Sequence, residues 1–153
     1  MNIRTVATSE APFELLTLAD PSIERIQQHL VHGQLLVGYE PDYQQAIAAA
    51  IVNDYGDHLE ISNIAVTPAQ QGRGRGKQMI AFIIAFARQQ GYSQLRVGTG
   101  NSSLEQLAFY QKCGFRIIGV IPDYFGDDDP TIFENGIRCQ DMVLLAYSLT
   151  SIS

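Results

Sequence analysis

The sequence predicts one α/β domain, in which about four helices cover the faces of a mixed sheet of about seven strands. Three observations predict this fold. The chain has 153 residues, close to the commonest size of a single domain. Two segments, 76–90 and 102–113, have the apolar spacing of helices with one buried face. Short apolar segments bounded by turn residues surround them and are typical of strands. No linker or repeat divides the sequence, so residues 1–153 are expected to form a single domain.

The first third of the chain predicts one strand and two helices. Residues 2–7 form the strand. Segments 12–19 and 21–31 each begin near a proline, which a first helical turn tolerates. The second segment has apolar residues at helical spacing and is followed by Gly33, which ends the helix.

Three consecutive strands follow, at 34–39, 45–53 and 58–66. The second is rich in alanine, which favours a helix, but its short length and the Asn-Asp-Tyr-Gly turn after it favour a strand. In the third, strict alternation predicts one face of Leu59, Ile61, Asn63 and Ala65, and an opposite face of Glu60, Ser62, Ile64 and Val66.

The rest of the chain alternates helices and strands. The helix at 76–90 is followed by Gly91 at the position of a C-terminal cap. The helix at 102–113 can be capped by Ser102 or Ser103. The strands expected around these helices are 94–98, 115–121 and, after an acidic loop, 141–149.

Charge and cysteine content exclude several classes of function. The formal charge is -6 at pH 7, whereas nucleic-acid-binding domains usually carry an excess of basic residues. The two cysteines form no Cys-x-x-Cys motif and the histidines do not cluster, so no metal site is expected. The longest apolar run, 79–87, is too short to span a bilayer, and we expect no secretory signal. The expectation is a cytoplasmic protein that binds neither membrane nor nucleic acid, and a homodimer is left open.

The stretch QQGRGRGKQM, residues 70–79, lies between the strand that ends at Val66 and the helix at 76–90. It does not fit the G-x-x-x-x-G-K-[ST] phosphate loop or the G-x-G-x-x-G dinucleotide motif. A hinge and an RNA-binding Arg-Gly segment are alternatives, but the order strand, loop, helix favours an anion site. The first amides of a helix lack internal partners, and glycines without Cβ atoms let a bulky anion approach them. The prediction is therefore a phosphate site, to which charge is added by Arg73, Arg75 and Lys77.

The segment 71–76 resembles the Q/R-x-x-G-x-G/A signature of the GCN5-related N-acetyltransferase (GNAT) family. The flanking sequence agrees, because a long apolar helix and Asn101 follow, and 109–115 (FYQKCGF) is similar to the family's Tyr-x-Lys-x-Gly-Phe helix end. The resemblance is strongest from Glu60 to Val120. It implies a mostly antiparallel sheet and the transfer of an acetyl group from acetyl-coenzyme A (acetyl-CoA) to an amine.

The resemblance also implies roles for individual residues. Tyr110 matches the tyrosine that protonates the leaving thiolate, and Glu60 matches a glutamate that takes the proton of the acceptor ammonium. The alternatives are a structural tyrosine and an exposed strand glutamate. Asn101 would bond the coenzyme arm, or cap a helix. The residues implied to bind acetyl-CoA are Ile64, Ala65, Val66, Gln71, Gly72, Arg73, Gly74, Arg75, Gly76, Lys77 and Asn101.

The resemblance implies that the acceptor pocket is shaped by the early helices and by the long segment 122–142, which joins the last two strands. Its aromatic and acidic residues suit a cationic amine, although a solvated acidic loop is the alternative. The residues concerned are Asp123, Tyr124, Phe125, Asp127–Asp129 and Glu134. We therefore expect direct acetyl transfer to a primary amine of a small molecule or a peptide. A non-catalytic acyl-CoA sensor of the same fold is the alternative function.

Overall fold

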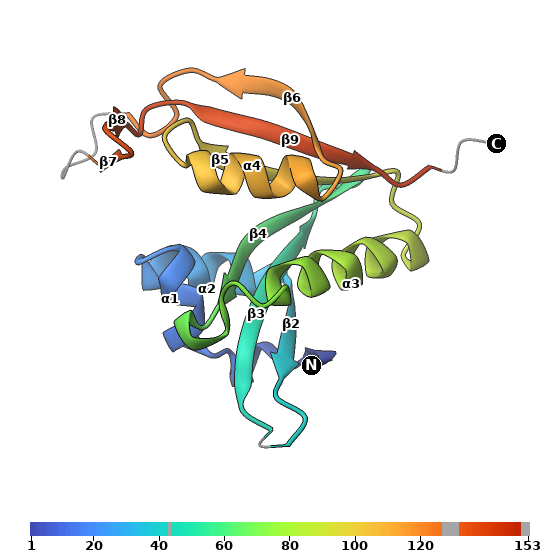
Figure 1. The fold of residues 1–153 in the computed structure, drawn as a ribbon. Helices are drawn as coiled ribbons and strands as arrows, with labels where there is room; N and C mark the ends of the chain where they lie inside the picture. Colours follow the sequence, from blue (N-terminus) through green and yellow to red (C-terminus); the bar gives the residue numbers. More distant parts are fainter. Residues whose placement is uncertain (43, 127–131, 151–153) are drawn as a thin grey trace.

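The computed structural model describes residues 1–42, 44–126 and 132–150. Seven strands form one sheet in the order β1-β2-β3-β4-β5-β9-β6 (Figure 1). Only the β4–β5 pair is parallel, and the other five pairs are antiparallel. The strands are β1 (Asn2–Val6), β2 (Gln34–Tyr39), β3 (Ala46–Asp54), β4 (His58–Val66), β5 (Gln94–Gly100), β6 (Arg116–Ile121) and β9 (Met142–Ser148).

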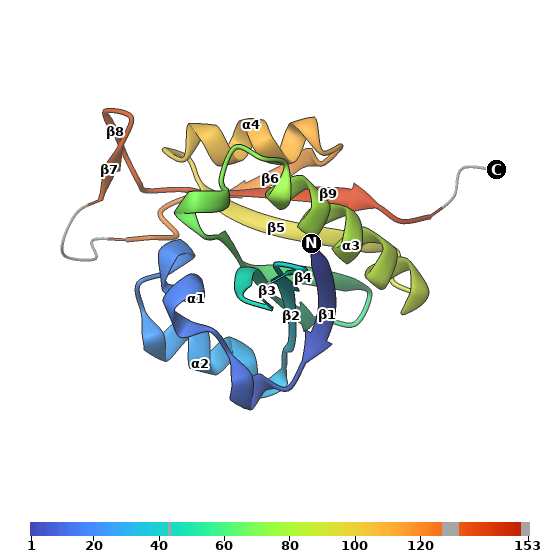
Figure 2. The same cartoon turned by 60° about the horizontal axis from the view of Figure 1, so that its bottom comes forward.

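Four α-helices cover the two faces of this sheet. They are α1 (Phe13–Ala19), α2 (Ile23–His32), α3 (Arg75–Gln89) and α4 (Leu104–Lys112). Helices α1 and α2 lie on one side of the sheet, and α3 and α4 lie on the other (Figure 2). The sequence-predicted α/β class, strands and helices are thus confirmed. The structure adds 3₁₀ turns at 8–10 and 68–70 and a hairpin of β7 (Phe133–Glu134) and β8 (Ile137–Arg138). No helix in the described part of the chain has the length and apolar character needed to cross a membrane.

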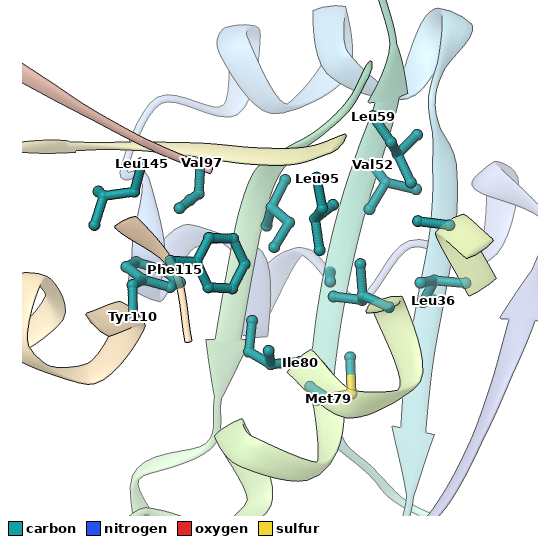
Figure 3. Close-up of a cluster of buried hydrophobic side chains, with 14 of the residues drawn as sticks. Leu36, Val52, Leu59, Met79, Ile80, Leu95, Val97, Tyr110, Phe115 and Leu145 are labelled. Atoms are coloured by element: carbon teal, nitrogen blue, oxygen red, sulfur yellow. The ribbon is translucent and has the colours of Figure 1, made fainter. Parts of the chain in front are cut away.

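The alanine-rich strand β3 lies at the centre of two hydrophobic cores. Residues 47–53 of this strand are all buried. Ala48 and Ala50 contact the core beneath α3 and α4, which Figure 3 shows. Ala49 and Ile51 contact the core beneath α1 and α2. Small side chains therefore suit a strand that helices cover on both faces.

Strand β4 does not keep a single alternation. Leu59 and Ile61 contact the core on the α3 side, and so do Ile64 and Val66. Between these pairs the register with β3 shifts by one residue, which makes a β-bulge at Ser62.

The expected grouping of β4 side chains is therefore wrong beyond Ile61. Asn63 does not share a face with Ile61, because the extra residue in the bulge exchanges the two faces downstream. It instead bonds α1 on the opposite side of the sheet. Ala65 pairs with Ala49, which belongs to the core beneath α1 and α2.

Three hydrogen bonds connect the bulge, directly or through Asn53 of β3, to helices α1 and α2. Ser62 Oγ donates to Asn53 Oδ1 at 2.6 Å, and Asn53 Nδ2 donates to the carbonyl of His29 in α2 at 3.0 Å. Asn63 Nδ2 donates to the carbonyl of Leu16 in α1 at 3.0 Å. Both asparagines are buried. These polar contacts oppose a return of β4 to regular alternation, because that return would break them inside the protein.

The bulge also marks the place where β4 leaves β5. The parallel pairing of the two strands runs only from His58↔Gln94 to Ile61↔Val97. Farther along, β4 stays paired with β3, and β5 stays paired with β9 as far as Gly100. The two halves of the sheet diverge from this point (Figure 1). The edge of β4 at 64–66 is consequently left without β5 as a partner.

We predict that Asn53 and Ser62 stabilise the fold as a pair. Asn53→Ala and Ser62→Ala should each lower the free energy of unfolding by about 1–3 kcal/mol, because each breaks a largely buried hydrogen bond. The double variant should cost less than the sum by about 1 kcal/mol. Urea unfolding of the four proteins measures this coupling. Fully additive costs would show that the bond does not stabilise the bulge.

Candidate functional site

The loop between β4 and α3 owes its shape to glycines. Gly72 and Gly74 have φ of +78° and +77°, values that side chains with a Cβ rarely adopt, and a Cβ on either would point into open space. Gly74 is the residue that precedes α3. Gly76 has a different reason: a Cβ there would lie 3.2 Å from Phe109 Cζ, so its absence lets α4 pack closely.

The start of α3 presents unpaired amides to this loop. The first helical hydrogen bond runs from Gln78 N–H to the carbonyl of Gly74, at 3.1 Å. The amides of Arg75, Gly76 and Lys77 precede it and have no partner within the helix. With the positive end of the helix dipole, they form a site suited to an anion.

The polar side chains of the loop differ in their contacts. Gln71 Nε2 donates to the carbonyl of Val66 at 2.9 Å and so closes the loop onto the end of β4. The Arg75 guanidinium donates to Gln70 and Gln78, which holds it along the helix. Arg73 and Lys77 are exposed. We infer that Gln71 and Arg75 shape the loop, while Arg73 and Lys77 present charge at its surface.

A groove of about 470 Å³ continues from the loop between α3 and the end of α4. It is lined by Gly74, Lys77, Gln78, Ile80, Ala81, Ile84, Lys112 and Cys113. Lys77 was predicted from the sequence, whereas Lys112 was not, although it stands in the segment FYQKCGF. Burial raises the pKa of the Cys113 thiol, and the nearby Lys77 partly opposes this. The groove therefore has apolar walls with two ammonium groups.

Tyr110 lies in the core beneath α3 and α4, and only 4% of it is exposed. Its ring makes edge contacts with Phe109 and Phe115, at centroid distances of 5.4 and 5.6 Å. Figure 3 shows it beside Phe115. Burial, with a smaller effect of Cys113, raises the pKa of the Tyr110 phenol above its ordinary value. The phenol consequently keeps its proton throughout the neutral range.

Glu60 lies on the opposite face of the sheet from Tyr110. Its register partners are Asn53 on β3 and Arg96 on β5. The Asn53 side chain donates to the carbonyl of His29 in α2. Glu60 is half-buried. Burial and the neighbouring Glu60 carboxylate raise the pKa of the Tyr55 phenol, so a phenol stands within electrostatic range of this carboxylate.

The segment after β6 brings two aromatic residues to this second face. Gly100, at the end of β5, has no side chain, and a Cβ there would lie 3.6 Å from Phe125 Cε2. Gly100 shares its face with Arg96, by alternation along β5. Tyr124 makes an edge contact with Phe125 at 5.1 Å. Tyr124, Phe125 and Glu60 are therefore on the same face, whereas Asp127–Asp129 lie outside the described residues.

Two other sequence-predicted residues hold the protein together in this structure. Glu134 accepts hydrogen bonds from Ser102 Oγ and Ser103 Oγ at 3.1 and 2.9 Å, so it is bound to the start of α4. Ser103 directly precedes α4, but its side chain makes no capping bond. Asn101 Oδ1 accepts from the amides of Gln140 and Asp141, both at 2.9 Å. Asn101 thus joins the end of β5 to the segment before β9, and does not cap α4.

The structure divides the candidate residues into two groups. The loop, the groove and Tyr110 belong to the α3–α4 face, and Glu60, Tyr124 and Phe125 belong to the α1–α2 face. Residues 64–66, at the end of β4, pair with β3 but no longer with β5, so one backbone edge of this segment has no neighbouring strand. Among the described residues, no group of three His, Cys, Asp or Glu side chains is placed to hold a metal ion.

Comparison with known proteins agrees with this geometry. Residues 3–115 match the Acetyltransferase (GNAT) family. The chain is 40% identical over 143 residues to the "Uncharacterized N-acetyltransferase YvbK" of Bacillus subtilis (strain 168), which covers 93% of this chain and 92% of the relative. The chain therefore belongs to the GNAT family of acetyltransferases.

Solved structures show the same fold at comparable identity. The IAA acetyltransferase from Bacillus cereus has a TM-score of 0.89 at 40% identity, over 96% of this chain and 98% of that one. A GNAT family acetyltransferase from Elizabethkingia anophelis, solved with acetyl-CoA bound, has a TM-score of 0.89 at 39% identity, over 96% of this chain and 97% of that one. Acetyl-CoA is accordingly the co-substrate of this protein.

We predict that the loop glycines are needed for coenzyme binding beyond their effect on stability. Gly74→Ala should raise the Kd for coenzyme A about tenfold or more, because the left-handed conformation costs about 1–2 kcal/mol for a residue with a Cβ. Gly91→Ala is the matched control, since Gly91 has φ of +85° and open space at the other end of α3. Calorimetric titration with coenzyme A measures both variants. Equal affinities for coenzyme A would remove Gly74 from the binding site.

Proposed function

We propose that this acetyltransferase moves the acetyl group of acetyl-CoA directly to a primary amine of a small molecule or a peptide. One observation carries the proposal: two chemically different groups of residues lie on opposite faces of a sheet in which β4 and β5 diverge after Ile61. An anion site with an apolar groove and a protonated phenol suits the donor. A carboxylate with two aromatic rings suits an amine acceptor.

The α3–α4 face fits the shape and charge of acetyl-CoA. The pyrophosphate would lie against the amides of 75–77, with charge from Arg73 and Lys77. The remote end of the coenzyme would occupy the groove beside Lys112. Backbone groups at 64–66 that point toward the departed β5 are available to bind the pantetheine arm. The Asn101 amide could contribute only one hydrogen, since its oxygen accepts two bonds and its Nδ2 already donates to the carbonyl of Arg138 at 3.1 Å.

The chemistry follows from the placement of the two groups. The amine nitrogen attacks the thioester carbon, the nitrogen–carbon bond forms and the carbon–sulfur bond breaks. Glu60, directly or through water, takes the proton that the amine loses. Tyr110 gives its phenolic proton to the departing sulfur. A backbone amide of 64–66 stabilises the negative charge that develops on the carbonyl oxygen. Holding both substrates in line at the divergence of β4 and β5 supplies much of the rate.

The acceptor is proposed to enter from the α1–α2 side. Tyr124 and Phe125 offer ring faces that attract a cation, and Glu60 offers a negative charge. A cationic amine therefore suits this face better than an anionic one. Glu134 is left out of this site, because its carboxylate is bound to the start of α4.

The cysteines support a cytoplasmic location. Cys113 and Cys139 are both free and half-buried. Cytoplasmic thiols are kept reduced, whereas oxidising compartments favour disulfides. We accordingly propose that the protein acts in the cytoplasm.

Removal of the Tyr110 hydroxyl tests the proposed reaction. In a thiol-release assay with acetyl-CoA and a panel of primary amines, Tyr110→Phe should lower kcat about 10²–10⁴-fold, with little change in KM for acetyl-CoA. Tyr147→Phe is the matched control, because Tyr147 packs on the same Phe115 ring, at 5.6 Å. The control should keep its turnover. Equal turnover in Tyr110→Phe and wild type would exclude Tyr110 as the acid.

The wild-type protein in the same assay separates an enzyme from a sensor. Thiol release with at least one amine supports catalysis. Tight binding of coenzyme A without release with any amine would instead support the sensor. Mass spectrometry of the acetylated product shows whether nitrogen received the group.

The pH dependence provides an independent check on Tyr110. Its pKa is raised, so the proton-donating form is present at neutral pH and remains present as the pH rises through the ordinary tyrosine range near 10. We expect kcat to show no loss between about pH 8 and pH 10. A decline of kcat in that interval, absent from Tyr110→Phe, would contradict the assignment.

A further inference from the structure

The turn between β3 and β4 holds Tyr55 in a defined place. The Tyr55 amide donates to the carbonyl of His58 at 3.0 Å, and Gly56, with φ of +92°, lets the chain reverse between them. Ser93 Oγ donates to the carbonyl of Asp57 at 2.9 Å, which anchors the turn to the segment before β5. The turn is therefore fixed to both strands that carry Glu60 and its neighbours.

The Tyr55 ring lies over the side chain of His58. The two rings are stacked, with centroids 5.4 Å apart and planes inclined by 9°. His58 Nδ1 lies 2.9 Å from Asp57 Oδ1, so the histidine ring is itself held. His58 and Glu60 are two residues apart on β4, ahead of the bulge, and their side chains leave the same face of the sheet. The stack consequently places Tyr55 on the α1–α2 face, beside Glu60.

The electrostatics of the phenol agree with this placement. Burial raises the pKa of Tyr55, and the Glu60 carboxylate raises it further, both by its charge and by accepting a hydrogen bond from the phenol. Tyr124 adds a smaller effect in the same direction. The β3–β4 turn, strand β4 and the segment after β6 therefore each bring one polar side chain to the same place. Because Tyr55 is still 54% exposed, this place is open to a ligand from solvent.

Arg96 faces Glu60 from the other side. It is the register partner of Glu60 on β5, and its Nε donates to Gln94 Oε1 at 2.9 Å. Among the described residues, Glu60 and Arg96 form no ion pair. Such a pair would draw the carboxylate away from a substrate and reduce its ability to take a proton. Glu60 thus stands between a phenol that binds it and a guanidinium that could remove it from the reaction.

We propose that Tyr55 is a positioning residue, whose hydroxyl donates to the Glu60 carboxylate and keeps it turned from Arg96 toward the acceptor amine. This inference rests on the proposed function, in which Glu60 takes the proton that the amine loses. A carboxylate can accept several hydrogen bonds, so the bond from Tyr55 leaves lone pairs for the amine. Tyr55 keeps its own proton throughout.

Tyr55→Phe tests this role, because it removes the hydroxyl and keeps the ring that stacks on His58. In the thiol-release assay, kcat should fall about tenfold, as expected for the loss of one hydrogen bond to a charged group, while the KM for acetyl-CoA stays the same. Tyr92→Phe is the matched control. Burial and the Asp54 carboxylate raise the pKa of the Tyr92 phenol in the same way, but Tyr92 packs against the core beneath α3 and α4. The control should keep wild-type turnover, and an equal loss in both variants would overturn the proposal.

A double variant shows whether Tyr55 acts through Glu60. Glu60→Gln removes the charge of the carboxylate with little change in size. Adding Tyr55→Phe to Glu60→Gln should cause no further loss of kcat, because the group that Tyr55 positions has already been disabled. If Tyr55 only supported the fold, the two losses would multiply. Multiplied losses, or full turnover in Tyr55→Phe alone, would reject the positioning role.

A measurement on the protein without either substrate separates this inference from the proposed function. With tyrosine labelled by ¹³C at Cζ, the nuclear magnetic resonance signal of Tyr55, identified by its absence from Tyr55→Phe, reports the ionisation of this phenol. Glu60→Gln should lower the pKa of Tyr55 toward its ordinary value of about 10, since the carboxylate that favours the protonated phenol is gone. An unchanged titration would overturn the inference even if the wild type acetylates amines. If the wild type acetylates no amine, the proposed function fails, and the titration still decides whether Tyr55 holds Glu60.

Discussion

The hydrogen bond of 2.6 Å from Ser62 to Asn53 lies at the point where β4 leaves β5, and the geometry of the site depends on that point. With the bonds to α1 and α2, it fixes a bulge within a strand that is otherwise regular. The bulge exchanges the faces of the downstream residues, so that Ile64 and Val66 complete the core beneath α3. The same residues then present an unshared backbone edge, which a parallel neighbour would otherwise occupy.

In the proposed reaction, the divergence of β4 and β5 lets one sheet serve two substrates. The helix that follows β4 starts beside the opening, and Gly74 lets the chain turn into it with the first amides uncovered. At the end of β5, Gly100 leaves room for Cys139, whose Sγ would lie 2.8 Å from a Cβ there, and Asn101 fastens the segment before β9 to the same end of β5. The residues proposed for the donor and those proposed for the acceptor therefore lie on opposite faces of the sheet. A donor and an acceptor can meet between them without competing for the same surface.

Much of this arrangement could be predicted from the sequence, because it rests on local signals. Apolar residues at helical spacing predicted α3 and α4. The turn after β3 predicted a strand there, although alanine favours a helix. The glycine loop predicted an anion site at the start of α3, where the first amides precede the first helical hydrogen bond. The bulge could not be predicted in this way, because HLEISNIAV alternates well enough to read as a regular strand. Whether Asn63 faces α1 or α3 depends on the carbonyl of Leu16, which is distant in sequence. The attachments of Asn101 and Glu134 likewise depend on the hairpin, whose short strands carry little periodicity.

Asn63 shows how a residue that destabilises the core can still specify the position of the bulge in β4. It is buried, and its Oδ1 has no hydrogen-bond partner within the described residues. An unpaired buried oxygen costs about 1–3 kcal/mol, and an aliphatic side chain of similar size would avoid that cost. An aliphatic residue, however, would suit the core on either face of β4 and would not oppose regular alternation. The amide has a partner only on the α1 side, so it ties residue 63 to that face. The unpaired oxygen therefore destabilises the protein slightly, but the amide selects one register between β3 and β4. That register contains the bulge at which β4 leaves β5.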